Sequence, residues 1–257
     1  MTPELLTPIE VSQAGRYVVD PAYAMQPKRD GHRIILSSCT TRRAFNKRGE
    51  PCAAPPALLR GLPPDVTVDG EWERSHFVIF DLLDFLGHDL RSLPYTERLA
   101  ALLEAVKLRQ MPFSGQFSTI HTWFTEKAKE ENLLRGFQQR WEGVVFKRLD
   151  APYAPGRAGQ HFKLKFIKTC TVRVQNVEPT SARIEMLHSG GWIEVSGVSL
   201  IGRPKVQVGD FLEVKYLYAT KQSGQPRLVQ PVMIRKRGDV AENDCSTEQL
   251  VFKAEVI

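Results

Sequence analysis

The sequence has few cysteines and no long apolar run, and each shortage argues against a class of protein. The cysteines form no Cys-x-x-Cys pair, since they lie far apart at Cys39, Cys52, Cys170 and Cys245, so we expect neither a zinc site nor a disulfide framework. No apolar stretch approaches the length of a membrane span, and the first residues, MTPELLTPIEVSQ, lack the basic and apolar regions of a signal peptide. We therefore expect a soluble, cytoplasmic protein that does not associate with membranes.

Acidic residues are outnumbered by basic ones. With 35 lysines and arginines against 29 aspartates and glutamates, the formal net charge is +6. A basic surface favours a polyanionic partner, and nucleic acid is the first candidate. The length of 257 residues allows one large domain or two smaller ones with real cores.

The first two thirds of the chain mix strand and helix patterns. Runs of β-branched and aromatic residues predict strands at 32–40, 66–68, 76–83, 141–148 and 161–166. The clearest helix is YTERLAALLEAVKL, 95–108, with Thr96 as its expected cap and an expected apolar face of Leu99, Leu102, Leu103 and Val106. A second helix, rich in charge, is predicted at 125–140.

The pattern changes near residue 167. Only short alternating runs follow, namely TVRVQNV, ARIEML, GWIEVSGVSL, DFLEVKYLY, LVQPVMI and LVFKAEV, separated by turns such as HSGG and KQSGQP. About five strands without a strong helix predict a small barrel or sandwich. We therefore divide the chain into a mixed α/β domain, 1–167, and an all-β domain, 168–257.

One short stretch, MQPKRDGHR at 25–33, places Lys28 before an Asp-Gly pair. Taken alone, it is also typical of a charged turn. Three later segments contain further charged residues that could act together with Lys28: VDGE at 68–71, WEGVVFK at 141–147 and FKLKF at 162–166.

Lys163 and Lys165 are two residues apart, so a strand would place both side chains on one face. Glu142 and Lys147, by the same alternation, are expected to face opposite ways on one strand. Two lysines beside glutamates indicate a site for an anion and a metal ion.

In chain order, KRDG, DGE, FVIFDLLDFLG, EGVVFK and KLK resemble the nucleotidyltransferase motifs of ATP-dependent DNA ligases. RNA ligases and mRNA capping enzymes share that superfamily. The resemblance runs from about residue 21 to 165, and more weakly to about 240. It implies an α+β fold, in which a nucleotidyltransferase (adenylation) domain, residues 1–167, is followed by an all-β OB-fold barrel, residues 168–257.

The resemblance also implies catalytic roles. Lys28 matches the nucleophile that attacks the α-phosphate of ATP and carries AMP. Lys163 and Lys165 match the pair that holds this phosphate, where their charge would favour the reaction. Glu71 and Glu142 match metal-binding glutamates, and carboxylate oxygens are ligands that Mg²⁺ prefers.

Further positions match residues that bind ATP. Gln26 corresponds to a position that reads adenine, and Phe80 to the aromatic residue that stacks on it. Asp30 and Gly31 complete the first motif, and Arg33 matches an arginine near the ribose and the nick phosphate.

Two assignments are less direct. Ligases usually carry a serine-arginine-x-glycine segment after the first motif, and the nearest match here, FNKRG, has Lys47 in place of the arginine; Arg48 or Arg42 could substitute. QPVMIRKRGD resembles the last motif of the family, and we assign its Arg237 to the arginine that orients the pyrophosphate of ATP. Arg235 is the alternative residue, and a solvated basic hairpin without a catalytic role is the alternative interpretation of the segment.

The resemblance implies an ATP-dependent DNA ligase that seals nicks with 3′-hydroxyl and 5′-phosphate ends, using ATP and Mg²⁺. We expect nicked duplex DNA as its partner and a monomer. An RNA ligase ranks second and a capping guanylyltransferase third. A non-catalytic nucleic-acid-binding OB protein is the candidate from another class, although pure binding needs no nucleophile. NAD is not expected, because 27 residues precede Lys28, too few for a nicotinamide-binding domain.

Overall fold

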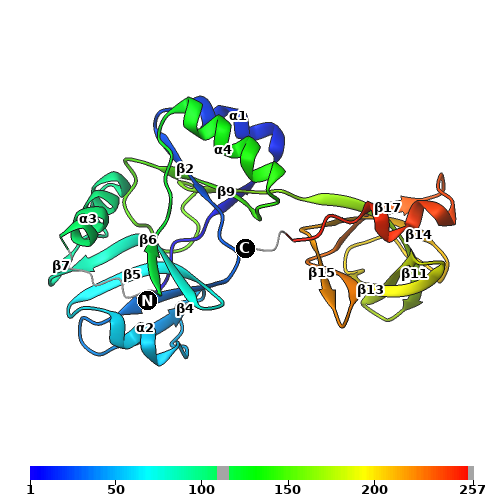
Figure 1. Ribbon diagram of the computed structural model, residues 1–257, viewed down its shortest axis with the longest axis horizontal. Helices are drawn as coiled ribbons and strands as arrows, with labels where there is room; N and C mark the ends of the chain where they lie inside the picture. The colour runs from blue at the N-terminus through cyan, green and yellow to red at the C-terminus, as the bar shows by residue number, and fades with distance from the viewer. Residues whose placement is uncertain (109–115, 254–257) are drawn as a thin grey trace. The chain divides into compact units, whose positions relative to one another are not determined.

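The computed structural model describes residues 1–108 and 116–253, which form two compact units, Met1–Lys165 and Phe166–Ile257 (Figure 1). The first unit contains two sheets and four helices among its described residues. The helices are α1 (Val11–Val19), α2 (Pro56–Gly61), α3 (Tyr95–Lys107) and α4 (Glu126–Gln138). None of the helices in the described ranges is both long and apolar enough to cross a membrane.

The smaller sheet of this unit carries the first and last predicted motifs. Its strand order is β1-β10-β9-β2, where β1 is Thr7–Ile9, β10 Phe162–Lys165, β9 Gly143–Arg148 and β2 Tyr23–Pro27. Figure 1 shows α1 and α4 side by side next to β2 and β9. The Tyr17 ring of α1 packs on Phe146 of β9 and Phe162 of β10, with ring centroids 5.3 and 4.6 Å apart. This helix therefore covers one face of the sheet and leaves the lysine-bearing face open to the rest of the unit.

The larger sheet has the order β4-β3-β5-β6-β7, with β8 paired to β6. Its strands are β3 (His32–Ser37), β4 (Arg43–Asn46), β5 (Val66–Glu73), β6 (His76–Phe85), β7 (His88–Asp89) and β8 (Phe117–Thr119). The alternating aliphatic residues of β3, β5 and β6 pack against Tyr95, Leu99 and Leu102 of α3 to form the hydrophobic core. This core holds β5 and β6 rigidly, and these strands carry the middle motifs.

The second unit is all β except for two 3₁₀ turns, Glu242–Cys245 and Thr247–Gln249, in its described part. Its five-stranded sheet has the order β13-β12-β11-β14-β17. These strands are β11 (Lys168–Val177), β12 (Ser181–His188), β13 (Gly191–Ser199), β14 (Phe211–Tyr216) and β17 (Val232–Arg237). A hairpin of β15 (Ala219–Gln222) and β16 (Gln225–Leu228) completes the unit. The all-β prediction is confirmed, but the described part of this unit has seven strands where about five were expected. The final predicted strand, LVFKAEV, is wrong in its described part, because residues 250–253 form only an isolated bridge between Phe252 and Ala219; residues 254–256 lie outside the described residues.

Two local predictions are wrong. The helix α3 begins after Pro94, so Thr96 lies within its first turn and does not cap it. Pro94 is the N-cap residue, with φ −51° and an extended ψ of 147°, and its missing N–H costs the helix no hydrogen bond, because the first amides of a helix have no partner within it. Leu103 is 46% exposed, and Ala105 instead joins Leu99 and Leu102 in the buried face.

Candidate active site

Glu142 joins the candidate nucleophile to one of the phosphate-binding lysines. Its Oε2 lies 2.6 Å from Lys28 Nζ, and its Oε1 lies 3.2 Å from Lys165 Nζ. The Glu142 side chain is only 4% exposed, whereas the two lysines are 18% and 25% exposed. Each carboxylate oxygen therefore neutralises one ammonium group, and the three side chains form a single charged cluster.

Glycine at position 143 makes this cluster possible. The backbone N–H of Lys28 donates to the Gly143 carbonyl at 2.9 Å, and Gly143 pairs with Lys165 across the sheet. A Cβ at position 143 would lie 1.9 Å from the carbonyl oxygen of Leu164. Only glycine fits here, so β9 can approach β10 closely and bring Lys28 and Lys165 to either side of one residue.

Glu142 itself corrects one expectation. It precedes β9 by one residue, so it does not share a strand with Lys147, and the alternation within β9 does not fix its direction. Lys147 instead lies in the interior, with Nζ 3.8 Å from both Glu4 Oε2 and Asp81 Oδ2.

Gln26 and Lys163 lie in the next row of the same sheet. Gln26 pairs with Val145, which pairs with Lys163, so all three side chains share a face. Burial and the positive charges of Lys165 and Lys28 lower the pKa of Lys163. These lysines are thus close enough to repel one another, as expected in a site that receives an anion.

Arg33 and Phe80 come together from β3 and β6. The guanidinium of Arg33 donates to Asp69 through Nε (2.9 Å) and through a terminal nitrogen (2.5 Å), and a further donor reaches the backbone carbonyl of Glu4. Its carbon lies 5.4 Å from the centroid of the Phe80 ring. This Asp69 partner was not predicted, although it lies two residues before Glu71 on β5 and therefore shares its face.

Glu71 supports the loop that follows Lys28. Its Oε1 accepts a hydrogen bond from the Gly31 N–H at 3.1 Å, and a Cβ on Gly31 would lie 2.2 Å from the Trp72 carbonyl oxygen. Burial, together with a smaller effect of the Glu142 charge, raises the pKa of Glu71 to about 7 against the opposing effects of Lys28, the Gly31 N–H and Arg33. The two predicted metal-binding carboxylates are therefore near enough to interact.

Glu73 orders the beginning of the same loop. Its carboxylate accepts hydrogen bonds from the Arg29 guanidinium, at 3.0 Å to Nε, and from the backbone N–H of Asp30, also at 3.0 Å. The structure thus places Asp30 and Gly31 against the end of β5, beside Glu71.

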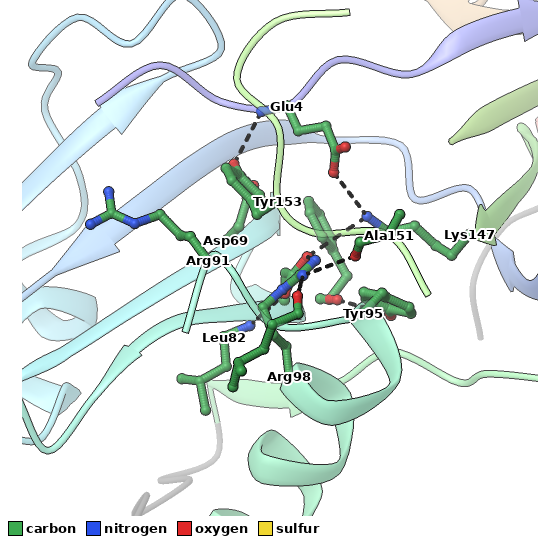
Figure 2. A network of polar contacts seen from close by, with 12 residues as sticks. Glu4, Asp69, Leu82, Arg91, Tyr95, Arg98, Lys147, Ala151 and Tyr153 are labelled. Atoms are coloured by element: carbon green, nitrogen blue, oxygen red, sulfur yellow. Dashed lines mark hydrogen bonds and ion pairs between the residues drawn. The ribbon is translucent and has the colours of Figure 1, made fainter. Parts of the chain in front are cut away.

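Behind these residues lies a buried network that the sequence did not reveal (Figure 2). The Arg98 guanidinium of α3 donates to both oxygens of Asp81, at 2.7 and 2.9 Å, and to the Leu93 and Ala151 carbonyls, at 2.6 and 3.2 Å. Tyr153 donates to Asp69 at 2.7 Å and accepts from the N–H of Glu4. The only sequence signal was the charge of Asp81 and Arg98 inside apolar patterns, which is why their pairing went unpredicted.

Among the described residues of the first unit, the predicted site residue Lys47 makes no contact with this cluster. Lys47 is exposed in the turn after β4, as is its alternative Arg48, while Arg42 donates to the carbonyls of Leu59 and Leu62. Arg237 ends β17 in the second unit and is paired with Asp239 at 2.6 and 2.8 Å.

Comparisons with known proteins agree with this geometry. Residues 64–165 match the family model of the ATP dependent DNA ligase domain. A curated relative, a probable DNA ligase of Streptomyces coelicolor, is 33% identical over 194 residues, which cover 72% of this chain and 36% of the relative. A second probable DNA ligase, from Streptomyces avermitilis, is 33% identical over 135 residues, or 49% of this chain and 25% of the relative. The chain therefore spans about a third or less of the length of these relatives.

Solved structures share the fold. A structure from a structure-function analysis of Lig E DNA ligases has a TM-score of 0.68 at 18% identity, with 92% of this chain and 99% of that chain covered. The ligase domain of M. tuberculosis LigD has a TM-score of 0.55 at 21% identity, with 98% of each chain covered. The predicted fold class, a nucleotidyltransferase domain followed by an OB-fold barrel, is thus confirmed. Residues 64–165 are therefore similar to the ATP dependent DNA ligase domain, and the chain is similar to part of two probable DNA ligases.

Proposed function

We propose that this protein is an ATP-dependent DNA ligase that seals nicks with 3′-hydroxyl and 5′-phosphate ends through a lysyl-AMP intermediate. The observation that carries the proposal is the Lys28–Glu142–Lys165 cluster, in which one buried carboxylate holds a lysine of the KRDG motif beside a second lysine. A purely structural surface would not bury a carboxylate between two ammonium groups, because desolvation of the three charges is costly.

The reaction has three steps, and Lys28 acts in the first two. Its Nζ loses a proton and attacks the α-phosphorus of ATP, forming an N–P bond as the bond to pyrophosphate breaks. A 5′-phosphate oxygen at the nick then attacks the same phosphorus and releases the Lys28 amine. Finally the 3′-hydroxyl attacks the 5′-phosphorus, closes the phosphodiester bond and expels AMP.

The surrounding residues serve the phosphates and the nucleotide. Lys163 and Lys165 share the face that Lys28 occupies and stabilise the charge that develops on the α-phosphate. Arg33 has its guanidinium fixed by Asp69 and serves the ribose and the nick phosphate. Phe80 stacks on the adenine ring, and Asp30 and Gly31 form the loop around Lys28. Arg237 orients the pyrophosphate of ATP, and Lys47 contacts the bound nucleotide.

Glu71 and Glu142 would hold Mg²⁺. Their carboxylates offer the oxygen ligands that a hard cation prefers. Burial is the main cause of the raised pKa of Glu71, and the charge of Glu142 adds to it, so a cation bound between the two carboxylates would offset their repulsion. No group of three or more histidine, cysteine, aspartate or glutamate side chains in the described chain could hold a metal, so phosphate and water oxygens would complete the shell. When bound, Mg²⁺ supplies neutralising charge for the reacting phosphates.

Nicked duplex DNA is the proposed substrate. Since the net charge is +6 and every proposed catalytic residue comes from one chain, the protein can act as a monomer on a polyanion. The proposed domains are residues 1–167 for adenylation and 168–257 for the OB fold.

The proposal is tested with labelled ATP and Mg²⁺. The protein should become labelled through an acid-labile, alkali-stable bond, and Lys28→Ala should abolish this labelling. Lys107→Ala removes an exposed lysine on α3 and should label normally. Sealing assays on matched nicked DNA and RNA duplexes then show whether the protein joins DNA strands or RNA strands.

Two results would contradict the proposal. Labelling of Lys28→Ala would place the nucleophile elsewhere in the chain. Sealing of nicked RNA but not of nicked DNA would make the protein an RNA ligase of the same superfamily.

A further inference from the structure

The side chain of Gln26 lies two residues before Lys28 and is only 3% exposed. Because side chains alternate along a strand, Gln26 of β2 and Lys28, which continues the β2 pairing with β9, point to the same side of the sheet. An amide buried beside the candidate nucleophile is a polar group whose orientation matters, because its two ends have opposite hydrogen-bonding character.

Two hydroxyl groups contact the nitrogen end of this amide. Gln26 Nε2 lies 2.6 Å from the Tyr95 hydroxyl and 3.0 Å from Thr122 Oγ1. The Tyr95 hydroxyl in turn lies 3.2 Å from the backbone carbonyl oxygen of Phe80, and Thr122 Oγ1 lies 3.4 Å from that of Ile120.

These secondary contacts fix the direction of the hydrogen bonds. A carbonyl oxygen can only accept, so the single proton of each hydroxyl is directed to Phe80, to Ile120 or into the hydrogen bond between the two hydroxyls, and not to Gln26. Both hydroxyls then present only lone pairs to Gln26, and the amide must turn its NH₂ toward them. A flipped amide would place its carbonyl oxygen against two acceptors, which is unfavourable in a buried site.

Tyr95 itself cannot move away. It is fully buried, with Lys147 Nζ 4.8 Å and the Arg98 guanidinium carbon 5.5 Å from its ring centroid (Figure 2). Burial and the charge of Asp81 raise the pKa of its hydroxyl, so the proton that it donates to Phe80 stays in place at neutral pH. Since Tyr95 contacts both the Gln26 amide and the Phe80 backbone, it ties together two residues assigned to the adenine side of the site.

The remaining polar atom of Gln26 is its carbonyl oxygen, an acceptor. Adenine carries an amino group at position 6, which donates, whereas guanine carries a carbonyl oxygen there, which accepts. An acceptor held in place thus pairs with adenine and repels guanine.

We propose that Tyr95 and Thr122 are positioning residues that hold the Gln26 amide with its carbonyl oxygen toward the nucleotide, and that they thereby make the site select ATP over GTP. The inference rests on the proposed function, since it assigns the base selectivity of the same site. Neither hydroxyl needs to contact the nucleotide.

The experiment measures self-labelling of the full chain with ATP and with GTP over a range of concentrations. The wild-type protein should prefer ATP. Tyr95→Phe and Thr122→Val each remove one acceptor and free the amide to flip, so the ratio of labelling efficiencies for ATP and GTP should fall by roughly tenfold or more. Thr122→Ser restores the hydroxyl and should restore the ratio.

Tyr216→Phe is the matched control. It removes a buried tyrosine hydroxyl that accepts from the Val251 N–H in the second unit, so the preference for ATP should not change. A merely structural role for Tyr95 and Thr122 would lower labelling by both nucleotides equally.

The outcomes separate the inference from the proposed function. Normal labelling by ATP with an unchanged ratio in both variants would overturn the inference and leave the ligase assignment standing. Absence of wild-type labelling by either nucleotide would overturn the proposed function. In that case, calorimetry can still measure the affinities of the wild-type chain for ATP and GTP. Equal affinities would overturn the inference that Tyr95 and Thr122 make the site select ATP.

Discussion

Arg98 and Asp81 form a two-point ion pair in which both side chains are completely buried, with nitrogen–oxygen distances of 2.7 and 2.9 Å. The pair connects α3 to β6, the strand that carries Phe80. Two further donors of Arg98 are satisfied by backbone carbonyls, so the guanidinium has partners on every side. This arrangement holds the adenine side of the proposed site against the hydrophobic core.

Asp81→Asn should therefore destabilise the first unit strongly. Removing one charge leaves the Arg98 charge buried without compensation, which costs about 3–5 kcal/mol. Urea unfolding followed by circular dichroism should show this loss. Asp150→Asn breaks an exposed pair with Arg148 and should leave the midpoint nearly unchanged, because exposed ion pairs contribute little. Equal effects of the two variants would mean that the buried pair is not what secures α3.

Gly143→Ala should destabilise the protein and lower labelling by ATP. The added Cβ would meet the Leu164 carbonyl at 1.9 Å, so β9 and β10 must separate, at a cost on the order of 1–3 kcal/mol. Gly15→Ala, in the exposed interior of α1 with no atom near the new Cβ, should instead stabilise by roughly 0.5–1 kcal/mol. Thermal unfolding of both variants checks the opposite signs, and a Gly143→Ala protein of unchanged stability would refute the close approach of the strands.

His161 should make stability fall as the pH is lowered from about 7.5 to 5.5. Burial and the charge of Lys147 lower its pKa, against the effect of Glu4, and its Nδ1 accepts from the Arg148 N–H at 2.9 Å. The unfolded chain takes up a proton near pH 6.5. The folded chain does so only at lower pH, so stability is lost as the pH falls through this window.

The variant His161→Gln isolates this contribution. Glu71, whose pKa is raised to about 7, acts in the opposite direction in the same window, but it is present in both proteins and cancels in their difference. Melting temperatures at several pH values should fall less steeply for His161→Gln than for wild type. Parallel curves would show that His161 does not titrate as described.

Arg237→Ala should separate the steps of the reaction. Because we assign Arg237 to pyrophosphate departure, the variant should lose labelling by ATP and keep much of its sealing of a nick that already carries AMP. Arg235→Ala is the matched control on the same strand, where Arg235 pairs with Glu213 at 2.7 Å. Equal loss of labelling and of sealing in Arg237→Ala would mean that Arg237 supports the fold or contacts DNA and does not act on the nucleotide. Loss of labelling in Arg235→Ala alone would assign the pyrophosphate-orienting role to Arg235.

The sequence by itself determined the order of the motifs and the elements that carry them. The strand pattern of FKLKF predicted that Lys163 and Lys165 share a face, because the two-residue period of a strand is a local property of the backbone. The same local rules predicted the helices near 95–108 and 125–140, which are confirmed as α3 and α4. The local rules failed for two residues of α3. Pro94 and not Thr96 is the N-cap of this helix, and the packing of the helix leaves Leu103 exposed.

Only the tertiary structure decided which charged groups meet. Glu142 and Lys28 are 114 residues apart, and no periodicity links them. Asp69 lies next to Arg33, and Asp81 next to Arg98, because the core brings the strands and α3 into contact. Likewise, the orientation of the Gln26 amide follows from hydroxyls that are 69 and 96 residues away. Local sequence sets the direction of a side chain on its own element, whereas burial against distant elements selects its partner and therefore its chemistry.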